Sequence, residues 1–258
     1  MRLEDKVAII IGGGQAPGES AAIGNGRATA LLFAREGAKV CSVDRSLESA
    51  QETADMIAKE GGTAIAAAAD VTDESTIETA IKACANEWGR LDILHNNVGI
   101  SVEGGDATLD KISMEAFERI FDVNLLGTML ACKHALPIMR DQKSGAIVNI
   151  SSAGGISPGS SSIAYSSSKA GLNHLTRCLA VAMSPEVAVN CVAPGLVENT
   201  RMAKRLPEAV SNGARRQAIL GRVGQTDDIA EQVLTFVTST SVTGQTLVID
   251  GGLPGAMR

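Results

Sequence analysis

The fold is decided by the stretch KVAIIIGGG at residues 6–14, together with GNGRATALLFARE at 24–36 and AKVCSVD at 38–44. The first segment is a short apolar run of mostly β-branched residues that stops at three glycines, which is typical of a buried strand entering a turn. The second segment has a helical period and is closed by Gly37, and the third is another strand, ending in Asp44. This order of strand, glycine-rich turn, helix, strand and acidic residue predicts the βαβ unit of a dinucleotide-binding site.

The residues of this unit have distinct physical roles. Glycines such as Gly12, Gly24 and Gly26 let the backbone approach a pyrophosphate, and the N-terminus of the following helix offers unpaired N–H groups and the positive end of its dipole. Glycines alone are weak evidence, because they also simply close turns. Asp44, 18 positions beyond Gly26, strengthens the prediction because its carboxylate can accept hydrogen bonds from both ribose hydroxyls. It would also repel a 2′-phosphate, so we expect NAD in preference to NADP, although Arg45 supplies a positive charge beside it.

Beyond residue 44 the alternation of strands and helices continues without any repetition of sequence. Further strands are expected at 63–69, 92–94, 146–150, 188–192 and 245–250, and helices at 47–60, 73–88, 163–182 and 227–238; residues 114–139 form one long helix or a closely joined pair. Such alternation predicts an α/β fold, a single-domain, Rossmann-like, doubly wound parallel sheet of about seven strands with helices on both faces. No linker divides residues 1–258, so we expect one domain, with a substrate lid within the charge-rich segment 196–220.

Composition argues against several kinds of partner and site. A formal charge of −6 and a pI near 5.2 argue against nucleic acid or an anionic membrane surface as a partner. Five cysteines without Cys-x-x-Cys spacing indicate buried thiols in a reducing compartment. The N-terminus lacks the apolar region of a signal peptide, and no run reaches the roughly 18 apolar residues of a membrane span, so we expect a cytoplasmic protein. The three histidines lack metal-ligand spacing, and no metal is expected.

A second site is indicated by Tyr165, the one tyrosine of the chain, and Lys169. Residues i and i+4 stand on the same face of a helix, so the phenol and the ammonium would point into the same space. A nearby cation favours the phenolate, which predicts a proton acceptor that works near neutral pH. An isolated Tyr-x-x-x-Lys is more often a half-buried helix face with a snorkelling lysine, so this pair alone does not establish catalysis.

These residues follow, in order, the motifs of a known family. The chain resembles the short-chain dehydrogenase/reductase family over nearly all of its length. The matching motifs are Gly12, Gly24 and Gly26; Asp70-Val71; Asn96-Asn97-Val98-Gly99; Asn124; Ser152 with Tyr165 and Lys169; and Pro194-Gly195. Ser152 is preferred to Ser151 because only Ser152 stands thirteen residues before Tyr165. Ordered matches of this kind are hard to obtain by chance, so a catalytic Tyr165 becomes the favoured interpretation.

The resemblance implies a role for each matched residue. Tyr165 would exchange a proton with the substrate oxygen while hydride moves between the substrate carbon and a nicotinamide, and Lys169 would lower the Tyr165 pKa and hold the nicotinamide ribose. Ser152 would hydrogen-bond the substrate oxygen, and Asn124 would open its helix enough to hold a water of a proton relay. The implied catalytic residues are Asn124, Ser152, Tyr165 and Lys169. The implied cofactor-binding residues are Gly12, Gly24, Asn25, Gly26, Asp44, Arg45, Asp70, Val71, Asn97, Val98, Gly99, Tyr165, Lys169, Pro194, Gly195 and Val197.

The chain departs from the family pattern mainly in its first glycine motif. Counting back from the helix assigns Gly24 and Gly26 to the last two glycines and Gly12 to the first, which implies an insertion of about eight residues, around 15–22, in the phosphate loop. Asn25 replaces the usual apolar residue. The other register, Gly12 with Ala16 and Gly18, would leave the helix too far from Asp44. After Pro194-Gly195 the threonine comes one place late, so either Asn199 or Thr200 meets the nicotinamide amide.

Three functions are compatible with these features. The leading hypothesis is an NAD-dependent oxidoreductase that interconverts a secondary alcohol and a ketone, acting on a small uncharged substrate. A reductase of 3-oxoacyl thioesters is the alternative within the same class, although Asp44 suits the NADPH of such enzymes poorly. A non-catalytic dinucleotide-binding regulator needs no acid–base tyrosine, so the set around Tyr165 argues against it. The resemblance also implies a homotetramer.

Overall fold

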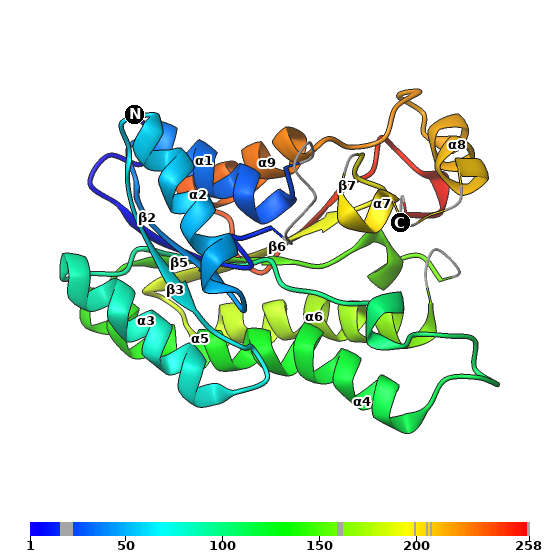
Figure 1. Cartoon of the computed structure of the whole chain (residues 1–258), viewed down its shortest axis with the longest axis horizontal. Helices are drawn as coiled ribbons and strands as arrows, with labels where there is room; N and C mark the ends of the chain where they lie inside the picture. The colour runs from blue at the N-terminus through cyan, green and yellow to red at the C-terminus, as the bar shows by residue number, and fades with distance from the viewer. Residues whose placement is uncertain (16–22, 159–161, 199, 205, 207, 257–258) are drawn as a thin grey trace.

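The computed structural model describes residues 1–15, 23–158, 162–198, 200–204, 206 and 208–256. Its centre is a seven-stranded sheet in the order β3-β2-β1-β4-β5-β6-β7, and every neighbouring pair is parallel (Figure 1). The strands are β1 (Val7–Ile11), β2 (Lys39–Asp44), β3 (Thr63–Ala68), β4 (Ile93–Asn96), β5 (Gly145–Ile150), β6 (Val187–Pro194) and β7 (Thr246–Ile249). The α-helices are α1 (Asn25–Arg35), α2 (Leu47–Lys59), α3 (Glu74–Trp88), α4 (Met114–Phe121), α5 (Gly127–Asp141), α6 (Ile163–Ala182), α7 (Arg201–Lys204), α8 (Glu208–Gln217) and α9 (Thr226–Thr238).

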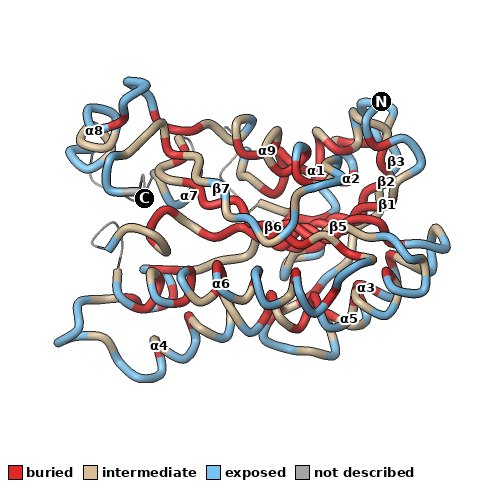
Figure 2. Tube along the Cα trace, turned by 180° about the vertical axis from the view of Figure 1, so that it is seen from behind, coloured by how far each residue is buried: buried red, intermediate tan, exposed pale blue. Residues whose placement is uncertain are grey.

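Helices cover both faces of the sheet, so the predicted doubly wound α/β fold is confirmed. In Figure 1, α1, α2 and α9 lie above the sheet, and α3, α5 and α6 lie below it. The view from behind in Figure 2 shows strands of the sheet buried between these two sets of helices. Two apolar clusters, one for each face, fill the space between strands and helices.

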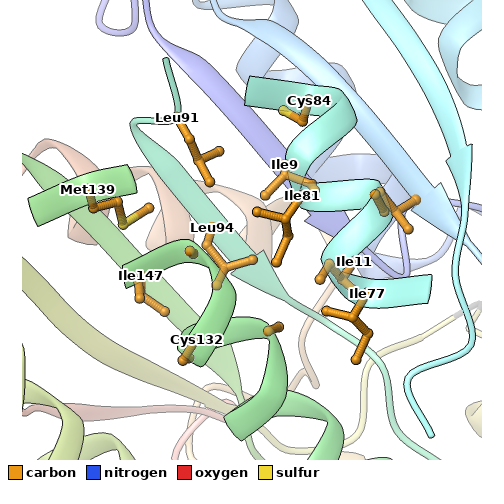
Figure 3. Packing of buried hydrophobic residues seen from close by; sticks show 14 of the residues in the cluster. Ile9, Ile11, Ile77, Ile81, Cys84, Leu91, Leu94, Cys132, Met139 and Ile147 are labelled. Atoms are coloured by element: carbon orange, nitrogen blue, oxygen red, sulfur yellow. The ribbon is translucent and has the colours of Figure 1, made fainter. Parts of the chain in front are cut away.

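Strand β1 contributes side chains to both apolar clusters. Ile9 and Ile11 belong to the cluster on the α3 and α5 face, whereas Ala8 and Ile10 belong to the opposite cluster. Figure 3 shows Ile9 and Ile11 packed with Ile77 and Ile81 of α3. Each fully buried isoleucine contributes about 1.5–3 kcal/mol relative to an exposed one. A continuous apolar run is therefore required here, because a strand with an alternating pattern would leave one face without apolar contacts.

The helices begin where side chains can satisfy their first N–H groups. Ser46, Asp73 and Ser113 accept hydrogen bonds from N–H groups in the first turns of α2, α3 and α4, respectively. Gly89 ends α3 in the left-handed region, with φ of 73°. Local capping thus explains the placement of the helices that follow β2, β3 and the segment after β4.

Two regions left open by the sequence become defined. Residues 114–139 form a closely joined pair, α4 and α5, with a π-helical turn at Asp122–Leu126 between them. The segment 196–220 contains the short helices α7 and α8, with residues 199, 205 and 207 outside the described part. A role for this segment as a lid stays a prediction.

The sheet order places the candidate functional residues together. Chain connectivity reverses between β1 and β4, which lie side by side at the centre of the sheet. In open parallel sheets, ligands bind at such a switch point, beyond the carboxyl ends of the strands. Gly12, Asp44, Asn97, Ser152 and Pro194 all stand at or just beyond the carboxyl ends of their strands. Within the described ranges, no helix is long and apolar enough to span a membrane.

Candidate active site

The turn after β1 is built so that the backbone of α1 can approach it closely. Gly12 has a φ of 86°, and a Cβ atom on Gly26 would lie 2.0 Å from the Gly12 carbonyl oxygen. Asn97 donates a side-chain hydrogen bond of 3.0 Å to the same oxygen. Only glycine fits at position 26, because no neighbouring backbone atom can yield by that much. The register that assigns Gly12 and Gly26 to the first and last glycines thus agrees with the geometry.

The predicted insertion lies mostly outside the described residues, as do Ala16 and Gly18 of the other register. Its two ends are held together, however. The Gly24 N–H, at the N-cap of α1, donates to the side-chain oxygen of Gln15 at 3.1 Å. Asn25 follows as the first residue of α1, and its side-chain oxygen is buried without a hydrogen-bond partner.

Two side chains of α2 support the turn after β1, residues 12–15, which we call the phosphate turn. Thr53 donates a hydrogen bond of 2.8 Å to the Gly13 carbonyl, and the Ser49 hydroxyl donates to the Gln15 carbonyl at 2.5 Å. Arg27 of α1 is buried and donates to Thr53 Oγ1 at 2.9 Å. Its guanidinium also pairs with Glu52 at 2.9 Å. The turn and the two helices therefore form one hydrogen-bonded unit.

Asp44 stands beside this turn at the end of β2. A Cβ atom on Gly14 would lie 2.8 Å from the Asp44 Cβ, so a larger side chain would collide with it. One Asp44 carboxylate oxygen accepts a hydrogen bond of 3.2 Å from the Ser46 N–H, which fixes the side chain next to α2.

Asp70 and Val71 follow β3 on the same edge of the sheet. Hydrogen bonds from the Thr72 hydroxyl and N–H lower the pKa of Asp70, and the positive charge of Arg45 contributes further. Val71 packs against α5, where a Cβ atom on Gly127 would lie 2.8 Å from the Val71 Cβ.

These features fit a nicotinamide dinucleotide. The backbone at Gly12 and Gly26 leaves no room for side chains, although Gly24 has open space around it. The N-terminus of α1 carries no side-chain cap and no acidic residue in its first turn, and a carboxylate stands at the end of β2. The residues that would hold the pyrophosphate and the adenosine ribose are thus within one compact region.

Tyr165 is buried at the start of α6, with 7% of its surface exposed. The Ser152 side chain, the predicted partner beyond the end of β5, lies near enough to the phenol to lower its pKa. Ser151 instead donates to the Lys169 carbonyl at 2.9 Å and acts as a brace for α6. Of the two serines, Ser152 is thus the one that lies next to the phenol.

Lys169 is also buried, and its ammonium donates to the Ile150 carbonyl at 2.8 Å. The Lys169 Nζ atom lies 5.9 Å from the centroid of the Tyr165 ring. A Cβ atom on Gly99 would come within 3.1 Å of Nζ, so glycine at that position gives the ammonium its space.

The pKa shifts of this pair are dominated by burial. Burial raises the pKa of Tyr165, the hydrogen bond from Ser152 opposes the shift, and the Glu103 charge adds to it. Burial lowers the pKa of Lys169 to about 8. The prediction of a lowered Tyr165 pKa is therefore wrong for the protein without bound cofactor. The loss of solvation outweighs any attraction by the Lys169 ammonium, which bonds to the Ile150 carbonyl.

Asn124 lies inside the π-helical turn and is fully buried. Its side-chain amide bonds both backbone groups of Ile100, accepting from the N–H at 2.8 Å and donating to the carbonyl at 3.0 Å. The same amide group donates to the Ser168 hydroxyl, which in turn donates to the Tyr165 carbonyl. Asn124 is thereby connected to the helix of Tyr165, and the opened helix that the sequence suggested is present.

The remaining predicted cofactor residues lie around the same edge. Val98 borders Gly12, with its Cγ2 atom 3.0 Å from where a Gly12 Cβ would be. Gly195, after Pro194, packs against Asp250 at the end of β7, and Val197 is buried and pairs with Gly224. The Thr200 hydroxyl donates to the Val197 carbonyl and accepts from Ala203 N–H, so it caps α7. Asn199 lies outside the described residues.

Sequence reasoning missed several polar residues of the site. Asp106 binds two N–H groups at the start of α6, and Glu103 pairs with Arg201 at 3.3 Å. Arg27 and Thr53 were also not identified as supports of the phosphate turn. Their partners in other elements lie between 22 and 98 positions away in the chain, so no local motif marks them.

Comparisons with known proteins agree with this geometry. The family model described as "Enoyl-(Acyl carrier protein) reductase" matches residues 20–254. A 3-oxoacyl-[acyl-carrier-protein] reductase of Thermotoga maritima is 37% identical, over 98% of this chain and 99% of that protein. A cis-4-hydroxycyclohexanecarboxylate dehydrogenase of Sinomonas cyclohexanicum is 35% identical, over 96% of each. A crystal structure described as a short-chain dehydrogenase/reductase, from Burkholderia xenovorans, superposes with a TM-score of 0.89 at 34% identity, covering 98% of both chains.

The chain therefore belongs to the short-chain dehydrogenase/reductase family, whose members use nicotinamide cofactors. It is an NAD(P)-dependent dehydrogenase or reductase with a single Rossmann-like domain.

Proposed function

We propose that this protein is an NAD-dependent oxidoreductase that interconverts a secondary alcohol and a ketone, with Tyr165 as the general acid and base. The observation that carries the proposal is the buried contact between the Ser152 hydroxyl and the Tyr165 phenol, with Lys169 one helical turn away. A regulator that only binds a dinucleotide would not require these groups to be desolvated together.

In the proposed reaction, Ser152 and Tyr165 hydrogen-bond the substrate oxygen and fix its position. When an alcohol is oxidised, the Tyr165 oxygen takes the hydroxyl proton; when a ketone is reduced, the phenol gives its proton to the carbonyl oxygen. A bound nicotinamide dinucleotide accepts or donates the hydride. Lys169 supplies positive charge beneath the phenol, which counters the effect of burial as the proton leaves. Asn124 and Ser168 hold the backbone of Tyr165 in place.

The preference for NAD is inferred from Asp44. Its carboxylate ends β2 beside the phosphate turn, where two hydroxyls of a ribose would be good hydrogen-bond donors and a phosphate would be repelled. Arg45 would favour NADP at this edge, and its charge acts on Asp70. Since the Asp44 side chain is held toward α2 by Ser46, we expect it to dominate the choice.

A second candidate is the reduction of a 3-oxoacyl thioester. It is supported by the similarity to the Thermotoga maritima protein, whose name gives that activity. The Sinomonas cyclohexanicum dehydrogenase is named for a cyclic secondary alcohol and therefore supports the first candidate. Its identity to this chain, 35%, is close to the 37% of the Thermotoga maritima protein.

The test is a panel of substrates with NAD(H) and NADP(H) in parallel, followed by nicotinamide absorbance. The panel contains cyclohexanone and cyclohexanol, cis-4-hydroxycyclohexanecarboxylate and acetoacetyl-CoA. We expect turnover of a secondary alcohol or its ketone with NAD(H). Faster reduction of acetoacetyl-CoA than of every simple ketone would favour the second candidate instead.

Substitution of the site residues then tests the assignment. We expect Tyr165→Phe to lower kcat by about 10²–10⁴-fold, the usual contribution of a general acid or base, with a far smaller effect on NADH binding in a calorimetric titration. Ser152→Ala and Ser151→Ala form a matched pair, and Ser152→Ala should lower kcat more. If Tyr165→Phe kept the wild-type kcat, the proposed role of the phenol would be wrong.

A further inference from the structure

We propose that Asp106 is a positioning residue that holds the first turn of α6, and with it Tyr165, in place. The proposal deepens the proposed function, on which its kinetic part rests. Asp106 lies in the segment between β4 and α4, and its side chain is buried, with 7% of the residue exposed.

The start of α6 lacks the local groups that usually satisfy a helix N-terminus. Its N-cap residue, Ser162, makes no side-chain cap hydrogen bond, and its first turn contains no acidic residue. The two carboxylate oxygens of Asp106 serve as the cap instead, since one accepts from the Ala164 N–H at 3.3 Å and the other from the Tyr165 N–H at 2.9 Å. A carboxylate at this end of a helix is also favoured by the helix dipole.

The segment that carries Asp106 is itself held firmly. The Asp106 N–H donates to the Ser101 carbonyl, which also accepts from Gly104. Gly105 has a φ of 92°, and a Cβ atom there would lie 2.9 Å from the Ala116 Cβ of α4. The segment starts at Ile100, whose backbone is bound by Asn124. Asp106 thus connects α6 to a frame made of α4 and the π-helical turn.

A small displacement of this turn would directly affect the reacting group. Tyr165 is the third residue of α6, so fraying of the first turn carries its phenol with it. The phenol has to remain close to Ser152, which follows β5 and does not belong to α6. A misplacement of about 1 Å can lower a rate by about 10²-fold, so the cap has a catalytic consequence without touching the substrate.

The test compares Asp106→Ala and Asp106→Asn with Asp73→Ala as a matched control. Asp73 caps α3, accepting from the Ser75 N–H at 2.9 Å, and makes no contact with α6 among the described residues. Hydrogen exchange is followed by mass spectrometry in the peptide that covers residues 163–169. Turnover of the best ketone of the panel is measured with the ketone and NADH varied in turn, which gives kcat and a separate KM for each.

We expect Asp106→Ala to speed amide exchange at the start of α6 by about tenfold, since two N–H groups lose their acceptor, and to lower kcat by about 30-fold. Asp106→Asn keeps one acceptor and should lie between Asp106→Ala and wild type. The KM for NADH should change by less than about twofold, because the phosphate turn is held by α2. Asp73→Ala should leave both the exchange of 163–169 and kcat at wild-type values.

Exchange in 163–169 that is the same in Asp106→Ala and Asp73→Ala would overturn the proposal. So would a kcat of Asp106→Ala within about twofold of the Asp73→Ala value while the enzyme remains folded. The exchange measurement needs no substrate. It therefore decides the positioning role even if every compound of the panel fails, which would count against the proposed function alone.

Discussion

Asp44 is the residue on which the choice of cofactor depends in the proposed function. We expect Asp44→Ala to weaken NAD binding by about 10–100-fold, because hydrogen bonds to a charged group contribute about 1.5–3 kcal/mol. Binding of NADP should improve at the same time, since the repulsion of a 2′-phosphate is removed. Calorimetric titration with both cofactors measures the ratio. Asp55→Ala is the matched control, because Asp55 lies exposed on α2 and its substitution removes the same charge. An unchanged ratio in Asp44→Ala would contradict the assignment.

His95 shows how one buried side chain can set the response of the whole fold to acid. It lies fully buried in β4, with Nδ1 bonded to the Val148 carbonyl at 3.0 Å and Nε2 without a partner. Burial lowers the pKa of His95 to about 4. In the unfolded chain the same imidazole would titrate near its ordinary pKa of about 6.5. Between these two pKa values the unfolded state binds more protons than the folded state. The contribution of His95 to the free energy of unfolding is therefore fully present above about pH 6.5 and is lost as the pH decreases.

The contribution of His95 can be measured from that pH dependence. By pH 4.5 the loss should reach about 2–3 kcal/mol, given about 1.4 kcal/mol for each unit of pKa difference. His95→Asn keeps a nitrogen donor toward Val148 and removes the titration. Urea titrations at pH 7 and pH 4.5 measure the drop in the free energy of unfolding between these two pH values. We expect this drop to be about 2–3 kcal/mol smaller in His95→Asn than in the wild-type protein. The exposed His174→Asn should behave as wild type. Equal acid sensitivity of His95→Asn and wild type would contradict this account.

At the scale of elements, α2 acts as a support for the phosphate turn. Thr53→Val keeps the shape of the side chain but removes its hydrogen bonds to Gly13 and from Arg27. We expect a loss of about 1–3 kcal/mol in the free energy of unfolding, since a carbonyl and a guanidinium remain buried without this partner. NAD binding should weaken as well. Thr79→Val is the control, because Thr79 bonds to Ser75 of its own helix and is exposed. Wild-type NAD affinity in Thr53→Val would show that the turn does not depend on α2.

The elements also show what could be predicted from the sequence. Periodicity was sufficient for strands and helices such as β1 and α6, because each has its own apolar pattern and stop signal. The π-helical turn around Asn124 was anticipated only as an opening of a helix, since its geometry depends on bonds to Ile100 and Ser168. The direction of the Tyr165 pKa was wrong, because burial is a property of the assembled fold. Asp106 was missed because the helix that it caps begins 57 positions later in the chain.

At the scale of the whole molecule, the β7 edge of the sheet bears on the predicted homotetramer. Strand β7 pairs with β6 alone among the described strands, and a groove of about 440 Å³ lined by Leu220, Leu247 and Val248 runs beside it. We expect an oligomer in solution whose mass falls when Leu247→Arg places a charge in this groove. Light scattering after size-exclusion chromatography measures the mass. Leu109→Arg, at an exposed apolar residue elsewhere, should leave it unchanged. A monomeric wild-type protein would refute the predicted assembly.

The hydrogen bond between Gln15 and Gly24 has a consequence for how this enzyme can diverge. This bond joins the two ends of the segment between them, and Gly12 and Gly26, which we propose to face the pyrophosphate, lie outside that segment. Doubling the length of a closed segment costs only about 0.6 kcal/mol of chain entropy. Insertions and deletions between residues 15 and 24 can therefore accumulate without displacing α1. We therefore expect the length of this segment to vary in evolution without a change in the affinity for the cofactor.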